Sequence, residues 1–127
     1  MLRQKNTAQK KEQAQKIIEQ IKVAAFHSEA NHRHMLQLLE AEWEGVKKNH
    51  DRASVARSYD NAIASARKSK FIHEEGLACE KAGFYHKRMK DDESAVKYFR
   101  QARECYQKWG SNFKVAFVQG ELDRLGY

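Results

Sequence analysis

The sequence predicts an all-α fold of about six helices that pack as antiparallel hairpins. Three observations predict it. The 127 residues contain no proline, a residue that breaks helix interiors because it lacks a backbone N–H and clashes with the preceding turn. Apolar residues recur at helical spacing, and alternating β-branched runs are missing. A helical pattern also occurs twice, with residues 58–62 aligning with residues 98–102 at an offset of 40, as in repeat proteins whose helix pairs stack to bury their apolar faces.

The N-terminal segment predicts a basic tail followed by a weakly amphipathic helix. Residues 1–7 are polar and are expected to be disordered, whereas residues 8–127 are expected to form a single helical-repeat domain. From about 8 to 26, alanine and isoleucine recur at helical spacing. Because this apolar stripe is narrow, we expect it to cover the N-terminal end of the array poorly and to allow weak self-association through this helix.

A first helix pair is predicted over about 31–68. Its first helix, about 31–48, has a strong apolar stripe and ends with Lys47–Lys48, two cations that suit the negative end of the helix dipole. Its second helix covers about 52–68. Asp51 directly precedes this helix, and an aspartate in that position caps the unpaired backbone N–H groups of the first turn.

A second helix pair is predicted over about 71–109. Its first helix, about 71–89, contains several small residues that allow a neighbouring helix to approach closely. Its second helix, about 92–108, carries the clearest apolar stripe of the chain. The acidic pair Asp91–Asp92 marks the start of this helix, where negative charge is favoured.

A closing helix is predicted over about 112–125. Gly110 precedes it and ends the previous helix, and Ser111 or Asn112 provides the N-cap. One face of the closing helix consists of Val115, Val118, Leu122 and Leu125, broadened by Phe113 and Phe117. We therefore expect this helix to cap the C-terminal end of the array.

The residues expected in the core point to a known type of repeat. These residues are Trp43, Tyr59, Ala62, Gly83, Ala95, Phe99, Ala102, Tyr106 and Trp109. Gly83, Ala95, Phe99 and Ala102 match the small, small, aromatic and small positions of the tetratricopeptide pattern, so the second pair resembles a tetratricopeptide repeat with a period of 40. The resemblance implies a right-handed α-α superhelix.

Several longer strings resemble one family of signalling proteins. Residues 59–63, 71–75, 102–110 and 114–115 occur in the order and spacing of a helical-repeat region found in large proteins that join a serine/threonine kinase-like domain and an ATPase to a sensor histidine kinase. The resemblance covers about residues 15–120. It implies a scaffold or coupling role and carries over no catalytic residues. It also leaves open that the chain is a fragment of a larger kinase–ATPase protein.

The charge distribution suggests an alternative function. The net charge is +7, but residues 1–16 hold five basic side chains against Glu12 alone, so that the body of the chain is nearly balanced. A basic helical domain that binds nucleic acid through this N-terminal arm is therefore the alternative to protein binding. The sequence has no apolar run long enough for a membrane helix, and Cys79 and Cys105 fall on apolar helix positions, as buried thiols of a cytoplasmic protein would.

The sequence predicts no catalytic, cofactor-binding or metal-binding residues. Its six glycines are scattered, whereas a phosphate-binding loop needs them clustered. His32 and His34 are two residues apart and miss the spacing of four that places two metal ligands on one helix face. His73 with the two cysteines has no close pair of zinc ligands. We therefore expect a chain that is not an enzyme.

The predicted function is non-catalytic protein–protein interaction, by an array that acts as a scaffold and couples domains in a signalling protein. The partner is expected to be a protein or peptide, or a neighbouring domain of a larger chain. It would lie in a groove lined by the first helix of each pair. The candidate groove residues are His32, Gln37, Glu40 and Glu44 in the first pair, and His73, Glu80, Lys81 and Lys87 in the second.

Overall fold

The computed structural model describes residues 9–19 and 29–127, and within them every regular element is a helix. A helix over residues 9–19 is followed by α2 (Glu29–Gly45), α3 (Arg52–Lys68), α4 (Ile72–Arg88), α5 (Asp92–Trp109) and α6 (Asn112–Arg124). The all-α fold class is thus confirmed. The expected tail over residues 1–7, and the part of the first predicted helix beyond residue 19, lie outside the described residues.

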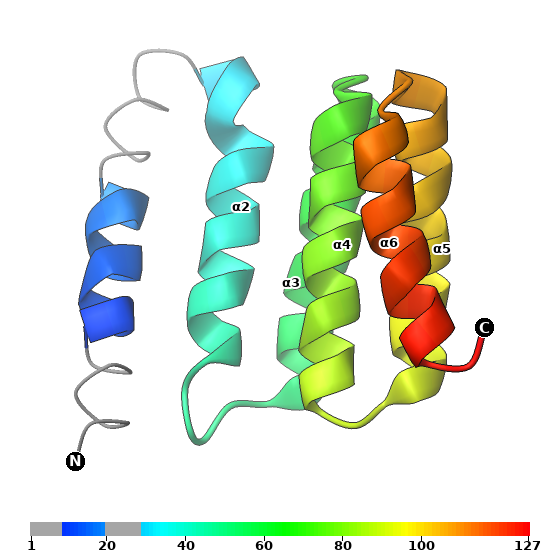
Figure 1. Ribbon diagram of the computed structural model, residues 1–127. Helices are drawn as coiled ribbons and strands as arrows, with labels where there is room; N and C mark the ends of the chain where they lie inside the picture. The colour runs from blue at the N-terminus through cyan, green and yellow to red at the C-terminus, as the bar shows by residue number, and fades with distance from the viewer. Residues whose placement is uncertain (1–8, 20–28) are drawn as a thin grey trace.

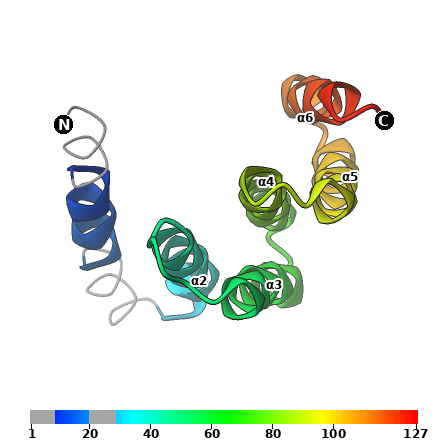
Figure 2. The ribbon, with the colours of Figure 1, turned by 90° about the horizontal axis from the view of Figure 1, so that it is seen from below.

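Consecutive helices from α2 to α6 lie side by side and alternate in direction (Figure 1). Seen along the helix axes, they form two staggered rows, with α2, α4 and α6 in one row and α3 and α5 in the other (Figure 2). The first row curves, and its concave side faces away from α3 and α5. The first helix of each predicted pair therefore lies on the concave face of the molecule.

Helices α3, α5 and α6 start where the capping signals predict. The side chains of Asp51, Asp91 and Ser111 accept hydrogen bonds from backbone N–H groups in the first turns of α3, α5 and α6. Gly110, with a φ of 93°, ends α5 in the left-handed conformation that glycine adopts without strain. One boundary is wrong in the prediction: α2 ends at Gly45, so that Lys47–Lys48 follow the helix and do not lie in its last turn.

The helix starts repeat the offset of 40 residues seen in the sequence. Helix α3 begins at Arg52 and α5 at Asp92, and α4 begins at Ile72 and α6 at Asn112. By position, α6 is therefore the counterpart of α4.

The centre of the core lies where α4 and α5 cross. A Cβ atom on Gly83 would lie 2.7 Å from the ring of Phe99, and one on Gly76 would lie 2.8 Å from the ring of Tyr106. Both rings are fully buried. Each glycine thus makes room for one aromatic side chain of α5, and this is why small residues are needed at these positions of α4.

All of the predicted core residues are buried except the two tryptophans. Trp43 is half-buried, and Trp109 is 50% exposed, which corrects its assignment to the core. Trp109 is the last residue of α5, where the chain turns away into α6, and its ring stacks on His73 at a centroid distance of 5.1 Å. A position on the apolar stripe does not ensure burial at a helix end, because the neighbouring helices no longer surround it.

The closing helix covers the core with one side only. Val118 and Leu122 are fully buried, whereas Phe113 is 79% and Phe117 is 41% exposed. The expectation that these two phenylalanines broaden the buried face is therefore wrong. Helix α6 covers α5 and leaves an aromatic side of its own uncovered.

Candidate partner-binding groove

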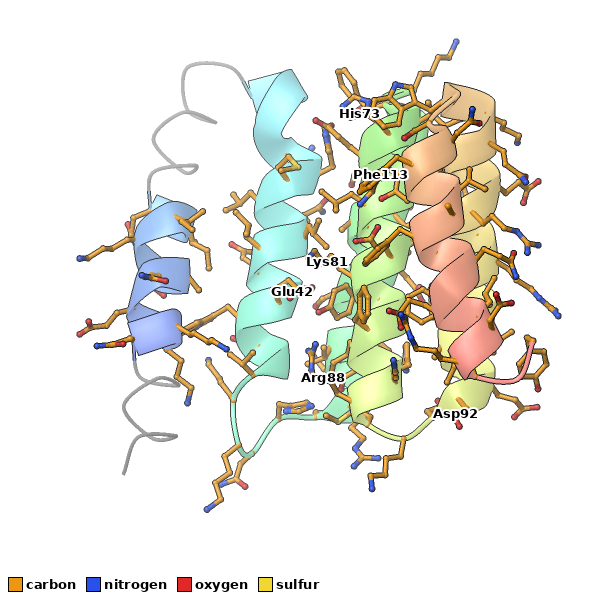
Figure 3. All side chains as sticks on the ribbon, in the orientation of Figure 1. Glu42, His73, Lys81, Arg88, Asp92 and Phe113 are labelled. Carbon is orange, nitrogen blue, oxygen red and sulfur yellow. The ribbon has the colours of Figure 1, made fainter. Side chains whose placement is uncertain are left out.

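A cavity of about 470 Å³ lies on the concave face between α2 and α4. It is lined by Glu42 of α2 and by Lys81, Phe84, Lys87 and Arg88 of α4. In Figure 3, Lys81 and Arg88 lie on the side of α4 that faces Glu42. We call this cavity the concave groove.

The spacing of residues along α4 explains how the groove forms. Lys81, Phe84 and Arg88 are three and four residues apart, so they share one helix face. Ala82 and Tyr85 belong to another face and are buried in the core. The same helix therefore contributes both to the core and to the groove.

Phe84 gives the groove an apolar wall that is fixed in place. Its ring meets Phe99 edge to face at a centroid distance of 5.1 Å, and the ring of Phe117 on α6 lies 6.2 Å away. Phe84 itself is only half-buried. An apolar side chain of a ligand would thus meet an aromatic surface already held by two neighbours.

The ionic partners of the lining residues leave a positive charge in the groove. Lys87 Nζ donates to Glu121 Oε2 at 2.9 Å, and Glu121 Oε1 also pairs with Arg124 at 2.6 Å. The Arg88 guanidinium lies 5.9 Å from the ring centre of Tyr85. Lys81 is half-buried and has neither an ion-pair nor a hydrogen-bond partner among the described residues. An unpaired ammonium group in a partly buried cavity favours an anionic ligand.

Glu42 is the single acidic residue lining the groove, and the core holds it in place. Tyr59 OH donates to Glu42 Oε1 at 2.9 Å. Burial, followed by the nearby Glu42 carboxylate, raises the pKa of Tyr59 far above its ordinary value. The tyrosine therefore keeps its proton and continues to donate, which fixes the Glu42 side chain on the rim of the groove.

Of the predicted groove residues on α4, the structure places two in the groove and two elsewhere. Lys81 and Lys87 line it. Glu80 is 4% exposed; it accepts a hydrogen bond from Tyr106 OH and forms an ion pair with Lys114 Nζ, both at 3.0 Å. Its prediction as an outward partner-binding residue is corrected, because this position of α4 faces α5 and α6. His73 lies at the start of α4, stacked on Trp109.

The predicted residues on α2 do not line the groove. Glu40 and Glu44 are exposed, and Glu44 pairs with Lys47 at 2.8 Å. Gln37 lines a separate cavity between α2 and α3. His32 lies in α2, and its side chain is outside the described residues.

Three lining residues are absent from the sequence prediction: Glu42, Phe84 and Arg88. For Phe84 and Arg88 a signal existed, since they share the helix face of Lys81. No comparable signal existed for Glu42, because its place in the groove depends on how α2 packs beside α4.

The two cysteines are free and buried, as the sequence predicts. Hydrogen bonding to Cys105, together with burial, raises the pKa of Cys79 well above that of an ordinary thiol. A protonated thiol is a poor nucleophile. In the described ranges, 9–19 and 29–127, no three histidine, cysteine, aspartate or glutamate side chains are grouped so that they could hold a metal ion.

Comparisons with protein-family models, with curated proteins and with solved structures find no match to this chain. None of the helices in the described part of the chain combines the length and apolar character needed to cross a membrane.

Proposed function

We propose that this chain is a protein-interaction module that binds a segment of a partner in the concave groove. The observation that carries the proposal is the half-buried, unpaired ammonium group of Lys81 beside the partly exposed ring of Phe84. A cation and an aromatic surface side by side suit a peptide that presents a carboxylate next to an apolar side chain.

The partner segment would be acidic. Its carboxylate would pair with Lys81 and be supported by Arg88, while its apolar side chain would pack on Phe84. Helices α2 and α4 supply a fixed frame, so little ordering of the chain itself would oppose binding. A scaffold or coupling role in a signalling protein, without catalysis, follows from the same proposal and is supported by the resemblance described for about residues 15–120.

Selection from a displayed library of random peptides tests the proposal. Peptides that bind the wild-type protein would be counter-selected against a Lys81→Glu, Phe84→Ala variant. We expect the surviving peptides to carry aspartate or glutamate next to an aromatic or aliphatic residue, and to lose at least roughly tenfold in affinity on Lys81→Glu alone.

Lys108→Glu is the matched control, because it makes the same change of charge on an exposed side chain of α5 outside the groove. Peptides whose binding falls equally with Lys108→Glu respond only to net charge and would contradict the groove. A library that yields no peptide dependent on Lys81 or Phe84 would contradict it as well.

A further inference from the structure

The concave groove holds two opposite charges that do not pair with each other. The carboxylate of Glu42 lies on its α2 wall and the ammonium group of Lys81 on its α4 wall, and Figure 3 shows the two residues on facing sides of the groove. Both side chains are half-buried. Among the described residues neither has an ion-pair partner. Both charges are therefore left to a ligand.

The Glu42 carboxylate is held at one oxygen and open at the other. Tyr59 OH donates to Oε1 at 2.9 Å, and Oε2 accepts no hydrogen bond within the described part of the chain. The Tyr59 ring is fully buried, so this hydrogen bond anchors the carboxylate on the α2 wall. Because a carboxylate can accept about four hydrogen bonds, Oε2 is able to accept one from a ligand.

The α4 wall carries a second cation, Arg88. Its charge opposes the rise in the pKa of Tyr59 that burial and Glu42 cause, which places it near the Tyr59 hydroxyl. It nevertheless forms no ion pair with Glu42 or with any other described residue. The α4 wall therefore keeps a positive charge even after the single carboxylate of the groove is counted against it.

We propose that the segment bound in the concave groove carries a basic side chain as well as an acidic one, and that it crosses the groove with its acid on α4 and its base on α2. This inference rests on the proposed function and deepens it. The acid would pair with Lys81, and the lysine or arginine of the segment would donate to Glu42 Oε2. Each half-buried charge of the groove would then gain the partner that it lacks.

A purely acidic segment would fit the groove less well. A second carboxylate of the segment would come to lie near Glu42, and like charges brought together at an interface oppose binding. Reversing a segment that carries both charges would place its acid against Glu42 and its base against Lys81. Glu42 thus selects both the composition of the partner and its orientation, by repelling the alternatives.

A double-mutant cycle between Glu42 and the basic residue of a bound peptide tests the inference. The probes are peptides selected on the wild-type protein that lose affinity on Lys81→Glu, each synthesised with its lysine or arginine and again with glutamine in that place. We expect the basic form to bind the wild-type protein at least roughly threefold more tightly, and this preference to disappear on Glu42→Gln. Glutamine keeps an oxygen that accepts from Tyr59 OH, so the variant removes the charge and retains the anchor. Calorimetry measures the four affinities.

Glu40→Gln is the matched control, because Glu40 is an exposed carboxylate of α2 that does not line the groove. This variant should keep the wild-type preference, and an equal loss of preference would contradict a pairing with Glu42. Selected peptides that need Lys81 and Phe84 but carry no basic residue overturn the inference and leave the proposed function intact. The same holds for a preference that survives Glu42→Gln. A library that yields no peptide dependent on Lys81 or Phe84 overturns both.

Discussion

The two helix pairs share a period of 40 residues, yet they are held together differently. In the second pair Phe99 of α5 lies on Gly83 of α4, ring against backbone. The equivalent residues of the first pair are Tyr59 and Trp43, and a tryptophan leaves no such space on α2. The ring of Tyr59 packs on Tyr85 of the next helix, α4, at a centroid distance of 5.4 Å, and its hydroxyl donates to Glu42 of α2.

One repeat pattern therefore serves two purposes in this chain. The second pair is closed around aromatic rings and forms the centre of the core. The first pair leaves Trp43 half-buried, and its Glu42 lies on the rim of the concave groove. Trp43 occupies the position at which the second pair has Gly83. Its bulk prevents the close packing of a ring within the first pair, and the Tyr59 ring packs on the second pair instead.

The largest effect should come from removing the ring at the centre of the second pair. Phe99→Ala should lower the free energy of unfolding by about 3–5 kcal/mol, because it opens a cavity among fully buried groups. Trp43→Ala should cost clearly less, since Trp43 is half-exposed. Urea unfolding of the two variants measures both values, and equal losses would show that the two pairs are packed alike.

Glycine substitutions should separate close packing from open surface. Gly83→Ala should destabilise the protein by about 1–3 kcal/mol, because the new methyl group would lie 2.7 Å from the Phe99 ring. Gly120→Ala should instead stabilise it by up to about 1 kcal/mol, because alanine favours helices and this side of α6 is open. Urea unfolding measures both, and a loss of stability with Gly120→Ala would show that a methyl group at Gly120 meets a close neighbour after all.

A hydrogen-bond deletion tests the polar contacts of the second pair. Tyr106→Phe removes the hydroxyl that donates to the buried Glu80 and should cost about 1–3 kcal/mol. Lys114 Nζ still pairs with that carboxylate at 3.0 Å, which keeps the loss below that of the Phe99 variant. Tyr59→Phe should cost less again, because its acceptor Glu42 is half-exposed and can turn to water. A larger loss for Tyr59→Phe in urea unfolding would reverse this ranking.

The smallest effect concerns pH and involves His86 of the second pair. Burial lowers the pKa of His86 below its ordinary value of 6.5, an effect that Asp91 and Asp60 oppose and Lys97 reinforces. The unfolded chain therefore binds this proton more readily than the folded chain, so stability should fall as the pH drops below about 6.5 toward the folded pKa. The first pair has Val46 at the equivalent position.

Urea unfolding at about pH 7.5 and about pH 5, on either side of the ordinary histidine pKa, measures this loss. His86→Gln should make the difference between the two conditions smaller, because glutamine does not titrate. His73→Gln is the matched control: His73 is exposed, and the variant should retain the wild-type difference. A difference that is unchanged by His86→Gln would assign the pH dependence to other groups.

Local sequence signals are sufficient to predict the helices, most of their ends and most of the core. Asp51, Asp91 and Ser111 act on the backbone N–H groups next to them, and apolar spacing is repeated within each helix. These signals operate over one or two turns, so they can be recognised without knowledge of the neighbouring helices. Tyr59, Phe99 and Tyr106 were predicted in the core for this reason, and they are buried.

The packing of the helices against one another determines which polar residues are buried, which aromatic residues are exposed and where the groove lies. Glu80 occupies a polar position of its helix, yet it is buried because Tyr106 and Lys114 come from α5 and α6 to meet it. Trp109 lies on an apolar stripe, yet it is half-exposed because its helix ends there. The burial of a side chain depends on what the neighbouring helices place against it, and that arrangement is set by the packing of whole helices rather than by the spacing of residues within one.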